Sequence, residues 1–266
     1  MPLPFASDAP LPVIAMLHLP PLPGSPRSAL SISAITEHVC REAEMLTALG
    51  AAGLMLENFG DMPLPATQVS PATVAQMSRI AAAVRMASSL PLGINVLRND
   101  SLAAMAIASA VGASFIRVNI LVGARLTDQG IIAGRADELL RLRKSLGAEE
   151  IQIWADVNVK HSWPLAPVSL EEETENTIRR GLADALIVTG RGTGYETDPH
   201  ELQAVISAAA GTPVLVGSGV TADSLANFQG ASGAIVGSWI KHQGDARSPI
   251  DPERVRRLMQ ASRNSK

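Results

Sequence analysis

The sequence predicts an α/β protein built as a single (β/α)8 TIM barrel, and two observations lead to that prediction. Short runs of β-branched and aliphatic residues alternate with amphipathic helical stretches along the whole chain. We count eight such pairs in 266 residues, close to the roughly 250 residues typical of a closed barrel. An open doubly wound sheet is the alternative, but no G-x-G-x-x-G turn follows the first strand.

The predicted strands are short apolar runs bounded by glycine, proline or polar residues. In chain order they are Val13–Leu19, Gly53–Phe59, Leu92–Leu97, Phe115–Leu121, Ile151–Val159, Ala185–Gly190, Pro213–Gly219 and Gly233–Ile240. The helical stretches follow near residues 31–49, 70–89, 101–111, 135–147, 169–181, 198–210, 222–228 and 252–262. This alternation implies parallel pairing through right-handed crossovers. No linker-like segment divides the chain, so we expect one domain over residues 1–266, with its core at about residues 11–262.

The first predicted strand ends in the stretch "MLHLPPLPGSPR", residues 16–27. Four prolines follow His18 closely, and proline has no backbone N–H to donate and fixes its own φ. We therefore expect the strand to stop at His18 and a stiff loop to follow it. In a TIM barrel this loop lies at the face where ligands bind, and His18 would be the last inward-facing residue of its strand.

Polar side chains share one face of the first five predicted strands. Residues two apart on a strand point to the same side, and in "IWADVNVK" the alanine and valines on one side leave Asp, Asn and Lys on the other. The stretches "AMLHL", "LMLEN", "GINV" and "FIRVNIL" show the same alternation. Because the apolar side suits the surrounding helices, the polar side is expected to face the barrel axis. The inward-facing set is His18, Glu57, Asn95, Arg117, Asn119, Asp156, Asn158 and Lys160.

These residues form the predicted catalytic site, because catalytic groups of such barrels gather at the C-terminal ends of the strands. Glu57 or Asp156 is the candidate general base, and His18 is the candidate acid. Lys160 either shifts the pKa of the base or forms a Schiff base with the substrate. The alternative is that these charged side chains only pair with one another inside the barrel and take no part in a reaction. The expected substrate-binding residues are Asn95, Arg117, Asn119, Asn158, His161, Thr189 and Arg191.

Glycine-rich ends of the last strands predict a phosphate site. The stretches "VTGRGTG", "VGSGV" and "VGSWI" close strands six to eight, and strands seven and eight commonly build the phosphate site of such barrels. Glycine lets backbone N–H groups approach an anion closely. A single stretch of this kind could form only a tight strand–helix turn without a ligand. Two such stretches at the ends of adjacent strands favour an anion site. The expected phosphate ligands are Gly217, Ser218, Gly219, Gly237 and Ser238.

Composition narrows the class of partner and the compartment. A net charge of -3 and 3% aromatic residues do not suit a nucleic-acid surface. The single cysteine, Cys40, excludes an internal disulfide and a multi-cysteine metal site, so we expect a cytoplasmic protein. No signal peptide is recognisable, and the most apolar segment, Leu102–Val111, is too short to span a bilayer. Peripheral contact with a membrane stays open. No cofactor is predicted; His18, Glu57 and Asp156 suit a divalent metal by type but not by any diagnostic spacing.

Several motifs give the chain a family resemblance. "MLHLPPLPGSPR", "ADVNVKHSWPLA", "VTGRGTG", "PVLVGSGVT" and "GAIVGSWIKHQGD" occur in the order found in the BtpA family, so the chain resembles that family from about Leu11 to Met259. The resemblance implies a TIM barrel of the phosphate-binding type. The matching positions are His18, the loop Pro20–Arg27, Asp156, Lys160, His161, Gly217–Gly219 and Gly237–Ser238. The chain departs from the family pattern at Ser224 and Ser232, where Asn and Asp are expected beside the anion site.

Two functions follow as hypotheses. The first is an isomerase, lyase or aldolase-like enzyme that acts on a small phosphorylated metabolite. The second comes from the resemblance alone: the founding member of the family is named for photosystem I biogenesis, which implies a non-catalytic assembly factor of membrane complexes. A barrel that binds a metabolite without chemistry is a third alternative. Barrels of this kind often assemble, so a homo-oligomer is expected.

Overall fold

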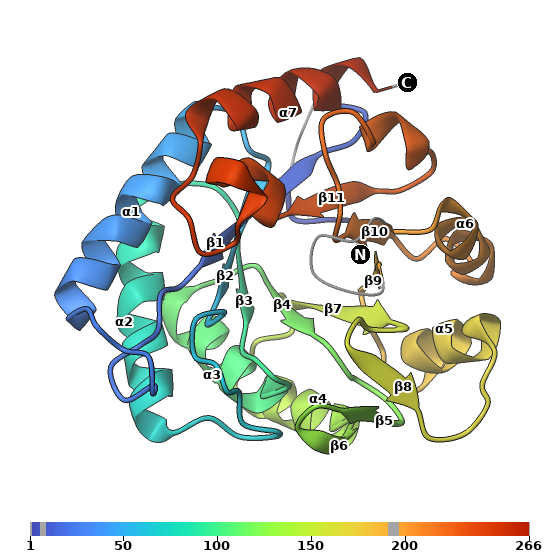
Figure 1. Ribbon diagram of the computed structural model, residues 1–266. Helices are drawn as coiled ribbons and strands as arrows, with labels where there is room; N and C mark the ends of the chain where they lie inside the picture. The colour runs from blue at the N-terminus through green and yellow to red at the C-terminus, as the bar shows by residue number, and fades with distance from the viewer. Residues whose placement is uncertain (1, 6–8, 191–196, 266) are drawn as a thin grey trace.

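The fold is described here from a computed structural model, which covers residues 2–5, 9–190 and 197–265. Eight parallel strands close into a barrel in the order β1-β11-β10-β9-β7-β4-β3-β2 (Figure 1). Their bounds are β1 (Val13–His18), β2 (Gly53–Glu57), β3 (Leu92–Asn95), β4 (Phe115–Val118), β7 (Gln152–Val157), β9 (Ala185–Thr189), β10 (Val214–Gly217) and β11 (Gly233–Val236). The predicted closed barrel is confirmed. Each strand ends one to four residues before its predicted end.

Helices surround the barrel on its outside (Figure 1). They are α1 (Ile32–Ala48), α2 (Pro71–Ala87), α3 (Ser101–Val111), α4 (Ala136–Ser145), α5 (Leu170–Arg179), α6 (Pro199–Ala208) and α7 (Pro252–Asn264). The first three begin where Ser31, Ser70 and Asp100 accept a hydrogen bond from a first-turn N–H, which satisfies a donor that the helix itself leaves free. The helix predicted at 222–228 is a correction: the described chain makes only a 3-10 turn there, η1 (Leu225–Asn227). Two more short 3-10 turns, η2 (Ser238–Ile240) and η3 (His242–Gly244), follow β11.

Large apolar side chains fill the half of the barrel nearer the N-terminal ends of the strands, which we call the lower half. The Phe115 ring stacks on Trp154 with 3.7 Å between ring centroids, and both side chains are buried. Gly93 on the neighbouring strand allows this stack, since a Cβ there would lie 2.0 Å from the Phe115 ring. Leu3 and Phe5 from the N-terminal segment pack against the same cluster. The other members of this cluster are Ile14, Met16, Met55, Ala185, Ile187, Leu215 and Ile235.

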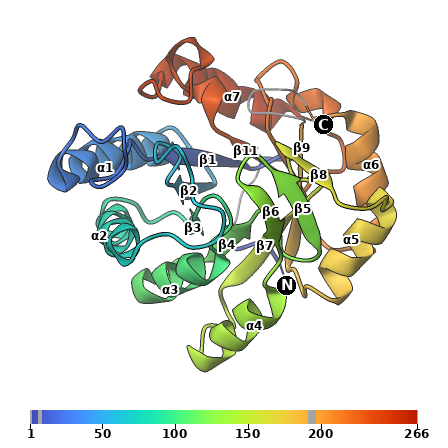
Figure 2. The same ribbon diagram turned by 60° about the horizontal axis from the view of Figure 1, so that its bottom comes forward.

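A second, smaller sheet, which the sequence analysis missed, lies outside the barrel. We call it the cap sheet: β5 (Ala124–Thr127), β6 (Gly130–Ala133) and β8 (Ser162–Pro164) pair antiparallel in the order β6-β5-β8. The connection from β4 to α4 supplies two of these strands, and the connection from β7 to α5 supplies the third (Figure 2). The cap sheet therefore belongs to the end of the barrel where the strands finish. No helix in the described parts of the chain could cross a membrane.

Candidate active site

The upper half of the barrel interior is polar. On four strands, an apolar residue of the lower cluster is followed two positions later by a polar one that lies toward the C-terminal end of the barrel. These pairs are Met16 and His18, Met55 and Glu57, Phe115 and Arg117, and Trp154 and Asp156. Since residues two apart on a strand share a face, the polar members point inward, as the alternation predicts.

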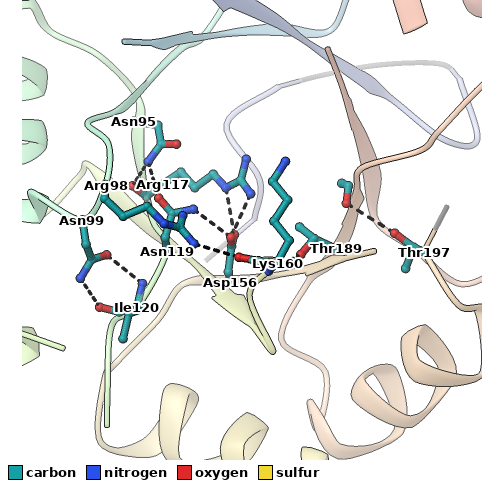
Figure 3. Close-up of polar contacts among 11 residues, drawn as sticks. Asn95, Arg98, Asn99, Arg117, Asn119, Ile120, Asp156, Lys160, Thr189 and Thr197 are labelled. Atoms are coloured by element: carbon teal, nitrogen blue, oxygen red, sulfur yellow. Dashed lines mark hydrogen bonds and ion pairs between the residues drawn. The ribbon is translucent and has the colours of Figure 1, made fainter. Parts of the chain in front are cut away.

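Arg117 and Asp156 form a buried ion pair at the centre of this polar half (Figure 3). Arg117 donates from Nε to Asp156 Oδ1 and from Nη2 to Oδ2, both at 2.9 Å, and Asn119 donates to Oδ2 at 3.0 Å. Asn95 donates in turn to the Arg117 carbonyl and to Asn119 Oδ1. Burial on its own would lower the pKa of Arg117, but Asp156 outweighs this effect and the pKa is raised. The Asp156 carboxylate is thus fixed by three hydrogen bonds and serves as an anchor.

Glu57 is a second buried carboxyl group, in a very different setting. Its residue is 6% exposed, and among the described residues no hydrogen bond reaches its side chain; His18 Nε2 lies 3.8 Å from Oε1. Burial raises the pKa of Glu57, an effect that the charges of Arg117 and Lys160 oppose. A carboxyl group with a raised pKa that lines a cavity is suited to taking up and releasing a proton.

His18 is held as a neutral imidazole. Burial, followed by the positive charges of Lys241 and Lys160, lowers the pKa of His18 to about 3. Its ring stacks on Phe59 with 4.7 Å between centroids. Gly237 leaves room for the ring, because a Cβ at that position would lie 2.7 Å from His18 Cε1. One reason for glycine at position 237 is therefore the histidine opposite it, whether or not an anion also binds there.

Lys160 extends into the site from the segment after β7. Its backbone is fixed at both ends: the N–H donates to Thr189 Oγ1 at 3.3 Å, and the carbonyl accepts from Arg98 Nη2 at 2.8 Å (Figure 3). Its Nζ makes no hydrogen bond or ion pair with any described residue. Burial and the nearby Arg117 guanidinium lower the pKa of Lys160 to about 8. This amine can therefore act as a proton donor or, once deprotonated, as a nucleophile.

The predicted phosphate ligands line the same cavity as these titratable groups. Residues 217–219 and 237–238 surround a space of about 50 Å³ together with His18, Glu57, Arg117 and Lys160. Ser218 has a φ of 96°, in a region that residues other than glycine rarely adopt, and Gly219 follows with a φ of 66°. Strained backbone of this kind concentrates at ligand sites. We call residues 217–219 and 237–238 the glycine cradle.

Several of the predicted substrate-binding residues do not line the cavity at the glycine cradle. Asn158 has a φ of 50°, because β7 ends at Val157 and the alternation stops; its side chain accepts a hydrogen bond from Arg125, and it does not line the cavity beside the glycine cradle. This corrects its predicted inward position. Thr189 supports the Lys160 backbone, as described above. His161 lines a second, larger cavity, and Arg191 lies outside the described residues.

The structure corrects the expected position of Ser232. Ser232 precedes β11, whereas the glycine cradle follows the same strand, so Ser232 lies at the opposite end of the barrel from the anion site beside which it was expected. Among the described residues, no three His, Cys, Asp or Glu side chains gather as metal ligands. Of the candidate ligands, Asp156 is bound by Arg117 and Asn119, and His18 and Glu57 alone make only a pair.

Distant residues that the alternation could not identify also shape the site. Lys241 is buried and donates to both carboxylate oxygens of Glu42 on α1, at 3.0 and 3.1 Å. Its charge is one cause of the low pKa of His18. Arg98, 6% exposed, follows β3 and binds the Lys160 carbonyl. Both cations lie outside the strands, where the period-two pattern gives no signal.

The sequence of this chain is similar to known proteins of one family. The model of the BtpA family matches residues 10–264. "Photosystem I biogenesis protein BtpA" of Synechocystis is 45% identical over 94% of this chain and 87% of its own length. An uncharacterized protein of Thermococcus kodakarensis is 44% identical over 95% of both chains, and one of Caenorhabditis elegans is 35% identical over 95% of this chain and 93% of its own.

Solved structures with a similar fold include three enzymes. Thiamine phosphate pyrophosphorylase from Pyrococcus furiosus has a TM-score of 0.59 at 12% identity, covering 97% of this chain and 98% of that one. Phosphoribosyl anthranilate isomerase from Thermus thermophilus has a TM-score of 0.58 at 12% identity, covering 94% and 98%. Orotidine 5'-phosphate decarboxylase from Pyrococcus horikoshii has a TM-score of 0.59 at 14% identity, covering 94% and 99%. At such identities the likeness extends to the TIM-barrel fold alone.

Proposed function

The chain belongs to the BtpA family, and from this premise and its site we propose that it is an enzyme that moves a proton on a small phosphorylated metabolite, as an isomerase or lyase does. One observation carries the proposal: the glycine cradle and the titratable groups Glu57 and Lys160 line one cavity. A phosphate held at the cradle would bring the rest of a small molecule next to both groups. The names of the structural neighbours, which include a phosphoribosyl isomerase and two enzymes of phosphorylated compounds, agree with a phosphorylated substrate.

The phosphate would bind through the backbone of the glycine cradle. Backbone N–H groups at such turns are good donors to phosphate oxygens. Lys160 and Arg117 line the same cavity and supply positive charge. Restraining the phosphate fixes the position of the reacting carbon, which lowers the entropic cost of the chemical step.

Glu57 is assigned the role of general base and Lys160 that of general acid. The ionised Glu57 removes a proton from the carbon beside a substrate carbonyl, and the Lys160 ammonium donates a proton to the carbonyl oxygen as charge develops there. In a substrate with a hydroxyl on that first carbon, Glu57 then gives its proton to the former carbonyl carbon, while the hydroxyl returns a proton to Lys160 and becomes the new carbonyl. The low pKa of His18 favours a neutral ring that orients the substrate rather than an imidazolium acid. Asp156 positions Arg117 and Asn119.

An aldolase-like reaction through Lys160 is the second candidate, and it is favoured by a buried amine that makes no ion pair with any residue that the structure describes. Neutral Nζ would attack a substrate carbonyl carbon, water would leave, and the resulting iminium would accept the electron pair of the breaking C–C bond. The pH profile separates the two roles. An acid role needs the ammonium, so the rate falls above about pH 8, whereas a nucleophile needs the amine, so the rate rises through that pH. Borohydride would trap only the iminium, as a mass adduct on Lys160.

A role limited to assembly of a photosystem is the competing function. It would come from the name of the cyanobacterial relative. The other two relatives described above come from an archaeon and a nematode, which have no photosystem, and they match this chain over nearly its whole length. An assembly role also gives no reason for buried Glu57 and Lys160 side chains beside a glycine cradle. We therefore rank it below both enzymatic candidates.

The test of the proposal is proton exchange in deuterium oxide. A panel of phosphorylated aldehydes and ketones is incubated with the protein, and incorporation of deuterium beside the carbonyl is followed by NMR. The proposal predicts exchange with at least one compound, reduced at least about 100-fold by Glu57→Gln. Glu37→Gln, on the exposed face of α1, is the matched control and should retain the activity. Absence of exchange with every compound that stabilises the protein would refute the acid–base function.

A further inference from the structure

A larger cavity of about 500 Å³ adjoins the space at the glycine cradle. The two spaces share four lining residues, namely Glu57, Phe59, Arg117 and Lys160. A molecule anchored at the cradle would therefore extend past Glu57 and Lys160 into the larger cavity. Its volume lies within the roughly 300–1,000 Å³ that small-molecule sites usually have.

The two cavities differ in the character of their walls. The wall of the space at the glycine cradle combines backbone and apolar side chains with the charged groups Glu57, Arg117 and Lys160. In the larger cavity, Met62, Leu64, Leu97, Leu126 and Trp163 make an apolar wall beyond Phe59, and polar and charged residues, Arg98, Asp128 and Arg247 among them, line the rest. A substrate whose charge is held at the cradle therefore gains most by placing a large apolar group against the apolar wall, since a polar group there would lose hydrogen bonds to water.

Part of this apolar wall comes from the cap sheet. Leu126 on β5 lies directly opposite Ile131 on β6 and Trp163 on β8, so the three form one row across the sheet. All three are exposed, at 46%, 62% and 64%. Only Leu126 and Trp163 line the cavity. Large apolar side chains left in water beside a charged site mark a surface that is covered when a ligand binds.

The opposite face of the cap sheet is anchored to the barrel. Arg125, 5% exposed, donates to Ser162, Asn158 and Glu173, and it thereby links β5 to β8 and α5. Ile132 of β6 is fully buried in a cluster with Ile120 and Val159. Leu126 and Trp163 therefore sit on a supported sheet rather than on a free loop, and they present a preformed wall.

We propose that this cavity receives an aromatic or similarly large apolar group of the phosphorylated substrate, and that Trp163 and Leu126 are the residues that select it. The inference rests on the proposed function, since the phosphate anchor places the ligand. It names a substrate class: a phosphomonoester whose other end is a ring, rather than a simple sugar phosphate. An aromatic ring suits Trp163 and Phe59 particularly well, because offset and edge-to-face ring pairs add to the gain from burial.

Calorimetric titration with two phosphomonoesters tests the inference. Phenyl phosphate and methyl phosphate are compared at a mildly alkaline pH where both are dianions, so they differ only in the apolar group. We expect phenyl phosphate to bind at least tenfold more tightly, which corresponds to about 1.4 kcal/mol. Trp163→Ala and Leu126→Ala should each reduce that preference while leaving the affinity for methyl phosphate unchanged.

The matched control is Ile131→Ala, a residue in the same exposed row that does not line the cavity. It should keep the full preference, and the melting temperatures of all three variants should confirm that they fold. Equal binding of the two compounds by the wild type, or a preference that survives both Trp163→Ala and Leu126→Ala, would overturn the apolar subsite while the phosphate anchor stands. If neither compound binds, the proposed phosphate anchor is wrong, and the inference fails with it.

Discussion

Two carboxyl groups lie at the mouth of the barrel, and their neighbours give them different properties. Asp156 accepts three hydrogen bonds from Arg117 and Asn119, whereas the Glu57 side chain receives none from the described residues. The first carboxylate is held in place by these hydrogen bonds, whereas burial raises the pKa of the second and favours its neutral form. The same pair of residue types therefore yields one structural anion and one group suited to proton transfer.

Substitution should separate these two roles without any knowledge of the substrate. Asp156→Asn removes the countercharge of buried Arg117 and should lower the free energy of unfolding by roughly 3 kcal/mol. Glu57→Gln removes a carboxylate that burial disfavours, so it should leave the stability unchanged or increase it at neutral pH. Because the pKa of folded Glu57 is raised, its contribution to stability is present at acidic pH and lost as the pH rises through that pKa. Urea unfolding of both variants would measure the difference, and equal destabilisation would contradict the assignment.

His18 gives a second prediction, in which stability is lost as the pH falls rather than as it rises. Its pKa is lowered from 6.5 to about 3 in the folded protein, so its contribution to stability is present above about pH 6.5 and lost as the pH falls toward 3. The loss should be on the order of 4 kcal/mol across that range. His18→Asn should flatten this part of the pH–stability profile, while His200→Asn, at an exposed position on α6, should leave it unchanged. Identical slopes for wild type and His18→Asn would show that His18 is not buried neutral.

At the scale of elements, alternation along the chain predicts the barrel strands and fails where a strand ends. The lower and upper residues of β1, β2, β4 and β7 face inward because the pleat enforces a period of two. Asn158 departs from this rule one residue beyond β7, where φ becomes positive. The cap sheet was not predicted because its support comes from Arg125, whose partners Asn158, Ser162 and Glu173 are 33 to 48 positions away. Such contacts leave no local pattern.

The cap sheet should loosen when Arg125 is replaced. Arg125→Met removes the guanidinium that binds Ser162, Asn158 and Glu173, so the amides of β5, β6 and β8 should exchange faster with deuterium. Arg135→Met, which removes the more exposed Arg135–Glu138 pair, is the matched control and should cost no more than about 1 kcal/mol. Hydrogen exchange by mass spectrometry distinguishes the elements. Unchanged exchange in the cap sheet would mean that apolar packing alone holds it.

At the scale of the whole molecule, polarity changes along the barrel axis. The lower half is filled by stacked rings and aliphatic side chains, and the upper half holds the ion pair, Glu57 and Lys160 around a cavity. The fold and most of the inward-facing residues could be predicted because both follow from periodicity. The pKa values could not be predicted, since they depend on burial and on nearby cations. Lys241, for example, is 223 positions from His18 in the chain and is brought close to it only by closure of the barrel.

The central claim is that a phosphate group anchors at the glycine cradle. The most direct measurement is the thermal stability of the protein with and without inorganic phosphate, at constant ionic strength, in wild type, Ser238→Asp and Ser232→Asp. These two serines lie at opposite ends of β11, and only Ser238 lines the cavity. Phosphate at 100 times its Kd should stabilise the wild type and Ser232→Asp by about 2.7 kcal/mol, and Ser238→Asp should lose that gain because its carboxylate repels the anion. No stabilisation of the wild type, or equal stabilisation of Ser238→Asp, would contradict the claim.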